Sequence, residues 1–473
     1  MDPKTFRKHA HDLVDWMADY LEGVSEYPVK SQVTPREIFN TLSTHPPQQG
    51  EPFPNIFADF VNKIMPGITH WQHPHFYAYF PANSSAPSIL GEMVMATLGA
   101  QCMIWDTSPA AAELEEMMMN WLQQMLDLPP HFTGVIQDTA SSATLCALLT
   151  AREKKSNWEI NTSGFGKQQN PKLRIYCSAE THSSIEKGVK IAGIGKENCI
   201  KIPVDENLGL CTDELEKAIQ QDLSNGFVPM CVVGTIGTTS TTAIDPIEKI
   251  GIICKKYDLW LHVDAAYAGS AMILPEYAYL RNGLEHADSF VFNPHKWMLT
   301  NFDCSAYFVA DTKSLLRTFE ILPEYLKTHN RGQVNDYRDW GIPLGRRFRA
   351  LKLWFVLRSY GVEGIQELLR THMDLTRYLQ TQIENHRDFE VVFPARFNLL
   401  GFRYAPQNIP LNRLNELNQR LINKLNQTGK IYLTHTKVHN RYTLRIVIGQ
   451  PNSTIEHVQN AWQLIEETAA QLV

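Results

Sequence analysis

Short apolar runs recur along the middle of this 473-residue chain and constrain its fold more than any other feature. Leu173–Cys177 and Met230–Val233 are two such runs, and Leu259–Val263 and Ser289–Phe292 follow at intervals of roughly thirty residues. Stretches with helical periodicity lie between them. Strands that alternate with helices in this way are typical of a parallel sheet with right-handed crossovers. The sequence therefore predicts an α/β fold from about residue 85 to 370.

Three polar residues follow these runs, at the positions where an open parallel sheet binds its ligands. Asp264 directly ends one run, Lys296 follows the next within Phe292–Leu299, and His182 comes after Leu173–Cys177. A buried lysine is more often uncharged than an exposed one, and its amine can form a Schiff base with an aldehyde. A neighbouring aspartate can keep a pyridine nitrogen protonated, so the pair fits pyridoxal 5'-phosphate (PLP) chemistry. A lone lysine after a strand is more commonly an ordinary surface residue, and the catalytic interpretation depends on the residues around Lys296.

The segment Thr139–Thr144 is rich in small residues and hydroxyls, and it precedes a helical stretch, Leu145–Arg152. The start of a helix offers backbone N–H groups to an anion such as a phosphate. A plain helix cap has the same composition, so this segment alone is a weak indication of a phosphate site.

The two ends of the chain follow other patterns. An apolar stripe from Phe6 to Leu21 predicts an amphipathic helix that must dock on another surface. Beyond residue 371 the pattern predicts several strands and a final amphipathic helix, for which Ser453 and Glu456 fit a capping box. The expected parts are an N-terminal helical segment, 1–84, a large α/β domain, 85–370, and a small α+β domain, 371–473.

Composition argues against several classes of protein. A net charge of −6 without a basic run argues against a nucleic-acid surface. The eight cysteines are scattered, so neither a disulfide framework nor a zinc site is expected. His70, His73 and His75 lack nearby cysteine or carboxylate partners and are interpreted as cleft-wall residues, not metal ligands. Without a bilayer-spanning apolar stretch or a signal-like N-terminus, we expect no membrane partner and a cytoplasmic location.

Many motifs together resemble the group II PLP-dependent amino-acid decarboxylases, and within them the aromatic L-amino-acid decarboxylases. The matching stretches occur in the family's order over nearly the whole chain. They are 6–23, 75–81, 108–109, 113–115, 262–270, 293–297, 301–306 and 342–352. The resemblance implies the type I fold of PLP-dependent transferases, with a mostly parallel seven-stranded sheet.

The resemblance also implies how the cofactor would be held. Lys296 would carry PLP covalently, Asp264 would pair with the pyridine nitrogen, and His182 would stack on the ring. The other positions that match cofactor contacts are Ala140, Ser141 and Asn293 at the phosphate, together with Thr239, Ala266 and His295. No metal is implied.

Tyr325 matches the tyrosine that delivers a proton to the substrate Cα after CO2 leaves, and 322–338 is predicted to be a mobile loop that closes over the site. Relatives that oxidise their substrate to an aldehyde carry phenylalanine at this tyrosine or lack the stacking histidine. This chain has both Tyr325 and His182, which favours simple decarboxylation.

By resemblance the substrate is an aromatic L-amino acid, and the protein is an obligate homodimer with its active site at the subunit interface. The residues that match the substrate pocket are Tyr79, Phe80, Pro81, Ala82, His182 and Gly345, with Met103, Ile104 and Trp105 reaching in from the partner subunit. Gly345 leaves room for a catechol or indole ring, where histidine decarboxylases and plant tyrosine decarboxylases tend to carry serine. Ala82 replaces the threonine of many animal aromatic decarboxylases, which removes a hydroxyl.

Other functions stay open at the level of sequence. They are an aldehyde synthase or a histidine decarboxylase of the same family, another PLP enzyme such as an aminotransferase, and a non-catalytic scaffold. An aminotransferase usually clamps the substrate carboxylate with an arginine, whereas a decarboxylase gains from leaving it in an apolar niche. A scaffold tends to lose the lysine, the aspartate or the loop tyrosine, and this chain keeps Lys296, Asp264 and Tyr325.

Overall fold

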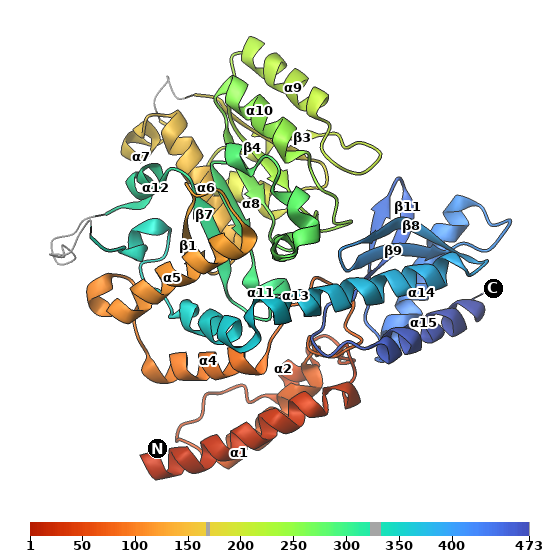
Figure 1. Ribbon diagram of the computed structural model, residues 1–473. Helices are drawn as coiled ribbons and strands as arrows, with labels where there is room; N and C mark the ends of the chain where they lie inside the picture. Colours follow the sequence, from red (N-terminus) through yellow and green to blue (C-terminus); the bar gives the residue numbers. More distant parts are fainter. Residues whose placement is uncertain (167–170, 322–332, 473) are drawn as a thin grey trace. The chain divides into compact units, whose positions relative to one another are not determined.

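The computed structural model describes residues 1–166, 171–321 and 333–472 (Figure 1). They form two compact units, one made by Ala82–Thr371 and the other by Met1–Pro81 together with the described residues from His372 onward. The division into 1–84, 85–370 and 371–473 stays a prediction. Within the described ranges, we find no helix with the length and apolar character that a membrane crossing requires.

A seven-stranded sheet forms the centre of the larger unit, in the order β1-β7-β6-β5-β4-β2-β3. Its strands are β1 (Thr133–Gln137), β2 (Leu173–Ser178), β3 (Cys199–Ile202), β4 (Val228–Thr235), β5 (Trp260–Asp264), β6 (Ser289–Phe292) and β7 (Ser305–Val309). β2 pairs in parallel with β3 and β4, β4 with β5, and β5 with β6, whereas β7 is antiparallel to both β6 and β1. The expected fold with a mostly parallel sheet is confirmed.

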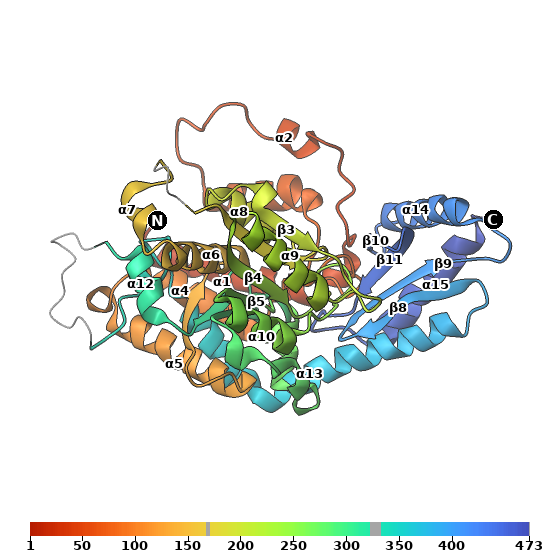
Figure 2. The same ribbon diagram turned by 90° about the horizontal axis from the view of Figure 1, so that it is seen from above.

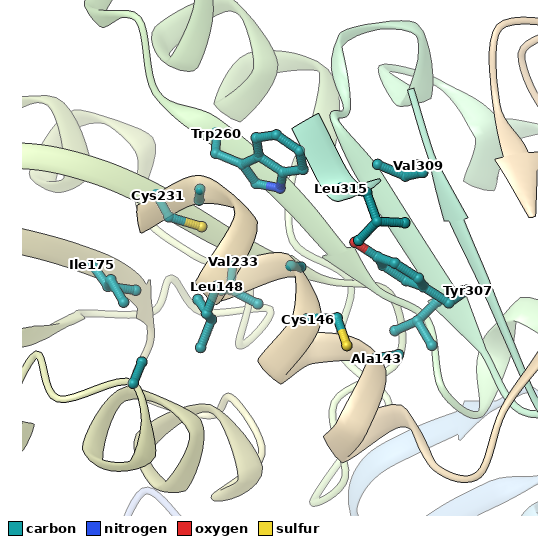
Figure 3. Packing of buried hydrophobic residues seen from close by; sticks show 14 of the residues in the cluster. Ala143, Cys146, Leu148, Ile175, Cys231, Val233, Trp260, Tyr307, Val309 and Leu315 are labelled. Carbon is teal, nitrogen blue, oxygen red and sulfur yellow. The ribbon is translucent and has the colours of Figure 1, made fainter. Parts of the chain in front are cut away.

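Helices surround this sheet (Figure 1). They are α4 (Ala86–Leu98), α5 (Pro109–Leu126), α6 (Ala140–Lys155), α7 (Glu159–Ser163), α8 (Ser184–Ile191), α9 (Thr212–Ser224), α10 (Ile247–Tyr257), α11 (Pro294–Trp297), α12 (Thr312–Phe319) and the first part of α13 (Arg349–Glu384). Helix α6 packs across β4 to β7. Figure 3 shows Cys146 and Leu148 of α6 among Val233, Trp260 and Tyr307 of three strands, all in one buried cluster. This packing holds α6, whose first residue follows β1 closely, against the strands of the sheet.

The other unit contains a four-stranded antiparallel sheet, in the order β10-β11-β9-β8. Its strands are β8 (Phe389–Arg396), β9 (Leu399–Tyr404), β10 (Thr434–Val438) and β11 (Arg441–Val447). Its helices are α1 (Pro3–Glu22), α2 (Glu37–Thr41), α3 (Phe53–Asp59), the end of α13, α14 (Leu411–Gln427) and α15 (Ile455–Ala470). Figure 2 shows α14 and α15 beside this sheet, and Leu421, Trp462 and Phe402 share one buried core.

The capping box expected at Ser453 and Glu456 is wrong by one residue. Helix α15 begins after Thr454, whose hydroxyl accepts the His457 N–H at 3.4 Å, while His457 Nδ1 accepts the Thr454 N–H at 3.2 Å. Two hydroxyl residues stand next to each other here, and the one with extended backbone directly before the first helical turn becomes the cap.

Candidate active site

The residues predicted to do chemistry follow strands that point the same way. Because β2, β4, β5 and β6 are parallel, the segments after their carboxyl ends meet at one edge of the sheet. Asp264 ends β5, Asn293 and Lys296 follow β6, His182 follows β2, and Thr239 follows β4. The start of α6, which comes after β1, lies at the same edge because β1 and β6 are both antiparallel to β7.

Lys296 lies on α11, where its main-chain N–H donates to the Asn293 carbonyl at 3.0 Å. Burial lowers the pKa of the Lys296 ammonium, and the charge of Asp264 opposes this shift. Partial loss of water also lowers the pKa of His182, which Asp264 opposes and Lys296 reinforces. The three side chains are therefore close enough to interact electrostatically. An amine with a lowered pKa is more often unprotonated, as attack on an aldehyde requires.

Asp264 is only 5% exposed, and its own chain orients it. Its Oδ1 accepts the N–H of Ala266 at 3.0 Å. The carbonyl of Ala266 in turn accepts the N–H of Asn293 at 3.0 Å, so the turn after β5 is tied to the residue after β6. A buried carboxylate fixed in this way can hold a protonated ring nitrogen by charge and by a hydrogen bond.

His182 is held by its neighbour in sequence. Its Nδ1 accepts the N–H of Ser184 at 3.2 Å and lies 2.8 Å from the Ser184 hydroxyl. The side chain is otherwise exposed within the chain. An exposed aromatic ring that is fixed at one edge can stack on a flat ligand.

The N-terminus of α6 offers donors to an anion. Thr139 caps the helix, with its hydroxyl accepting the Ser142 N–H at 3.3 Å. Ser141 is exposed and Ala140 is half-buried, and the first turn contains no acidic residue. The free N–H groups of this turn and the positive end of the helix dipole suit a phosphate.

Asn293 and His295 add donors after β6. Asn293 Oδ1 accepts a hydrogen bond from the Ser305 hydroxyl at 2.7 Å, so the amide NH2 group is directed away from Ser305. His295 Nδ1 accepts the Cys304 N–H at 2.8 Å, so the neutral ring carries its proton on Nε2. Burial lowers the pKa of His295 to about 3, which keeps the ring neutral. This donor set, together with Lys296 and Asp264, fits PLP.

The turn after β4 presents Thr239 to the outside, while Thr238 folds inward and accepts the Ala243 N–H at 3.0 Å. Gly237 has a φ of +87°, and a Cβ there would lie 2.5 Å from the Cβ of Ala268. The turn therefore requires glycine at this position.

The expected substrate residues fall in both units. Tyr79, Phe80 and Pro81 belong to the smaller unit, where the Tyr79 hydroxyl lies 3.5 Å from that of Tyr432 and the Phe80 ring lies 5.8 Å from the Arg445 guanidinium. The others belong to the larger unit, and the assembly of both sets into one pocket stays a prediction.

Met103, Ile104 and Trp105 precede α5, and only Ile104 is buried. The Trp105 indole N–H donates to Glu113 at 2.9 Å. The entry of these three residues into a partner's pocket stays a prediction. Gly345 is exposed, Ala82 is half-buried, and Tyr325 lies outside the described residues.

The histidines considered for a metal are bonded to protein groups instead. The Tyr20 hydroxyl lies 2.8 Å from His70 Nδ1, and carbonyls lie 3.3 Å from His73 Nε2 and 3.2 Å from His75 Nδ1. Among the residues that the structure describes, we find no group of three or more His, Cys, Asp or Glu side chains that could hold a metal ion.

Two buried polar features were not predicted. Arg346, next to Gly345, forms an ion pair with Glu115 at 2.6 Å. His262, two residues before Asp264 on β5, contacts polar side chains of α6 and β6. The period of two along a strand places His262 on the same face as Asp264, and this spacing was the available signal.

The chain matches known proteins over its full length. Residues 35–405 match the model of the pyridoxal-dependent decarboxylase conserved domain. Tyrosine decarboxylase 3 from Petroselinum crispum is 42% identical, covering 100% of this chain and 93% of the relative. Phenylacetaldehyde synthase from Arabidopsis thaliana is also 42% identical, with 100% and 97% covered.

Solved structures agree with these sequence matches. Oryza sativa TDC with PLP and tryptamine superposes with a TM-score of 0.96 at 36% identity, covering 100% of this chain and 99% of that one. Catharanthus roseus tryptophan decarboxylase in complex with L-tryptophan gives 0.94 at 38% identity, with the same coverage.

The seven-stranded sheet and the similarity to a structure that contains PLP define a PLP-dependent enzyme of fold type I. The chain belongs to the pyridoxal-dependent decarboxylase family and is a PLP-dependent carboxy-lyase.

Proposed function

We propose that this enzyme decarboxylates aromatic L-amino acids to the arylethylamine and CO2, without oxidation to an aldehyde. The electrostatic grouping of Lys296, Asp264 and His182 at one sheet edge carries the proposal. The similarity to tyrosine and tryptophan decarboxylases supports an aromatic substrate. The candidate substrates are dihydroxyphenylalanine, 5-hydroxytryptophan, tryptophan, tyrosine and phenylalanine.

PLP, when bound, supplies a sink for the electron pair that remains on Cα when CO2 leaves. Lys296 would hold the cofactor covalently, and Asp264 would keep its pyridine nitrogen protonated. His182 would lie on the ring face and fix the plane of the ring, which selects the Cα bond that breaks. The proposed remaining contacts are Ala140, Ser141 and Asn293 at the phosphate, and Thr239, Ala266 and His295.

Tyr325 is the proposed proton donor to Cα, and it lies outside the described residues. Overall similarity does not distinguish decarboxylase from aldehyde synthase, because relatives of both kinds are 42% identical to this chain. The presence of both Tyr325 and His182 in the sequence favours proton transfer to Cα over oxidation.

A homodimer with a shared active site is part of the proposal. Helix α1 has no buried residue, and its apolar Phe6, Val14 and Leu21 are 60%, 44% and 39% exposed. On α4, Leu90 and Val94 are also exposed and lie one turn apart. Apolar faces of this kind commonly mark a protein interface. The free state of all eight cysteines supports the proposed cytoplasmic location.

The test is a product balance on the aromatic panel, with histidine included. Each substrate is incubated with the PLP-loaded enzyme, and CO2, amine, ammonia and peroxide are measured. We expect one amine for each CO2, without ammonia or peroxide. Ammonia and peroxide in step with CO2 would identify an aldehyde synthase, and histidine as the best substrate would identify a histidine decarboxylase.

A further inference from the structure

A buried hydrogen-bond chain lies beneath the candidate site and centres on His262. Its Nε2 lies 3.1 Å from the Thr144 hydroxyl on α6, and its Nδ1 lies 2.9 Å from the Ser289 hydroxyl on β6. The Ser289 oxygen also accepts the indole N–H of Trp260 at 2.9 Å. Thr144, His262 and Ser289 are all 0% exposed. These contacts join three elements that are distant in sequence.

His262 is neutral in this setting. Burial lowers its pKa to about 4, although the charge of Asp264 opposes the shift. A neutral imidazole has one N–H donor and one acceptor, and both are used here by hydroxyl groups. Because the ring carries no positive charge, it leaves the Asp264 carboxylate free to pair with a cationic ligand.

The three joined elements are those that hold the proposed cofactor contacts. Helix α6 starts at the phosphate donors, β5 ends at Asp264, and β6 leads to Asn293 and Lys296. His262 and Ser289 are direct register partners between β5 and β6, and Asp264 pairs with Val291 further along. One rigid ligand must reach all of these groups, so their mutual separations have to be held closely.

We propose that His262 is a positioning residue for the cofactor, which fixes α6 against β5 and β6 so that the phosphate donors, Asp264 and Lys296 match the length of PLP. His262 acts through these groups. The inference rests on the proposed cofactor contacts and not on the identity of the amino-acid substrate.

The test compares His262→Phe, which keeps a ring and removes both hydrogen bonds, with Thr144→Val, which removes only the link to α6. His372→Phe is the matched control, because His372 is also 0% exposed, has its pKa lowered to about 4 by burial, and makes a ring hydrogen bond to the Gln450 carbonyl at 2.9 Å. His372 belongs to the other unit. Apoprotein is titrated with PLP and with pyridoxal, which lacks the phosphate, and the Tm of each apoprotein is measured.

We expect His262→Phe to raise the Kd for PLP by roughly ten- to hundredfold, the size of the loss seen when a residue that supports a metal ligand is removed. Thr144→Val should weaken PLP binding by a smaller factor. Pyridoxal should lose much less affinity than PLP in both variants, because it does not have to reach the phosphate donors. His372→Phe should lower Tm and leave the Kd for PLP unchanged.

Three results would overturn the proposal: wild-type PLP affinity in His262→Phe, equal losses for PLP and pyridoxal, or the same loss in His372→Phe. Should His262→Phe fail to fold, Thr144→Val decides, and wild-type PLP affinity there would refute the proposed link. These measurements need no turnover. A failure of the enzyme to decarboxylate aromatic amino acids would therefore refute the proposed function and leave this inference standing.

Discussion

At the scale of single residues, burial sets the charge states on which the site depends. It lowers the pKa of Lys296 towards the amine form, and it keeps His262 and His295 neutral by lowering their pKa values to about 4 and about 3. These neighbours therefore place no fixed positive charge beside Asp264. The sequence predicts Lys296 and Asp264 because each follows an apolar run. His262 was not predicted although its spacing of two residues from Asp264 was available, since a histidine inside such a run gains meaning only from the neighbours that folding brings to it.

Asp264→Asn tests the need for charge at the pyridine nitrogen. The amide keeps the shape of the side chain but cannot hold a proton on the ring by charge. We expect the variant to bind PLP and to lose about 10²- to 10³-fold in kcat, the usual effect of removing one preorganised electrostatic partner. Asp288→Asn is the control, because Asp288 is a second carboxylate of the larger unit, and its Oδ2 accepts the Leu261 N–H of β5 at 2.7 Å, away from the carboxyl edge of the sheet. Equal kcat values for Asp264→Asn and wild type would place the pyridine nitrogen elsewhere.

Gly345→Ser tests the substrate preference. A Cβ at this position would lie 3.3 Å from Nε2 of Gln101, whose Oε1 accepts the Arg346 N–H at 2.6 Å, so a shift of a few tenths of an ångström at the end of this side chain should admit serine. The added group narrows the space for a large ring. We expect kcat/KM to fall more for tryptophan and 5-hydroxytryptophan than for smaller rings, by about 1–3 kcal/mol in relative preference. An equal change in kcat/KM for every amino acid of the panel would show that Gly345 does not determine specificity.

At the scale of elements, burial on both faces made some strands predictable. β4, β5 and β6 are continuous apolar runs because helices cover both sides of the parallel sheet. β10 was not predicted, since it is an edge strand with alternating exposure and a polar sequence. The antiparallel direction of β7 could not be predicted either, because the direction of a strand depends on its connections and not on the local sequence pattern.

Thr139→Ala tests whether the start of α6 is a phosphate site or a plain cap. Loss of an N-cap hydroxyl destabilises a helix by about 1 kcal/mol in either case. Thr454→Ala is the matched control, since Thr454 caps α15 in the other unit. We expect similar losses of thermal stability in the two variants, and weaker PLP binding only in Thr139→Ala. If Thr139→Ala binds PLP like the wild type, its hydroxyl serves the helix alone.

At the scale of the whole molecule, the protein buries ionisable groups in both units, and this makes its stability depend on pH. Burial lowers the pKa of four histidines to about 3 or 4: His73, His262, His295 and His372. Two aspartates oppose this effect, since burial raises the pKa of Asp245 to about 7 and of Asp288 to about 6.

The sign of the pH dependence follows from proton binding. The window runs from about pH 6.5, the ordinary histidine pKa, down to about pH 4, near the lowered pKa of these histidines in the folded protein. Within it, the unfolded chain binds more protons at these histidines than the folded chain does. Their contribution to stability is therefore complete above this window and is lost as the pH falls through it. The aspartates act in the opposite sense, but they are fewer. We expect the denaturation midpoint to fall between pH 7 and pH 4.5, and to fall less in His372→Phe. A midpoint that rises on acidification would contradict this expectation.

The central claim is that Lys296 carries the cofactor beside Asp264. The most direct test reduces the PLP-loaded protein with borohydride, digests it and locates the modified lysine by mass spectrometry. We predict loss of the visible absorbance on reduction and a single modified peptide that contains Lys296, with neither signal in Lys296→Ala. A cofactor adduct on any other lysine, or unchanged visible absorbance after reduction, would contradict the claim.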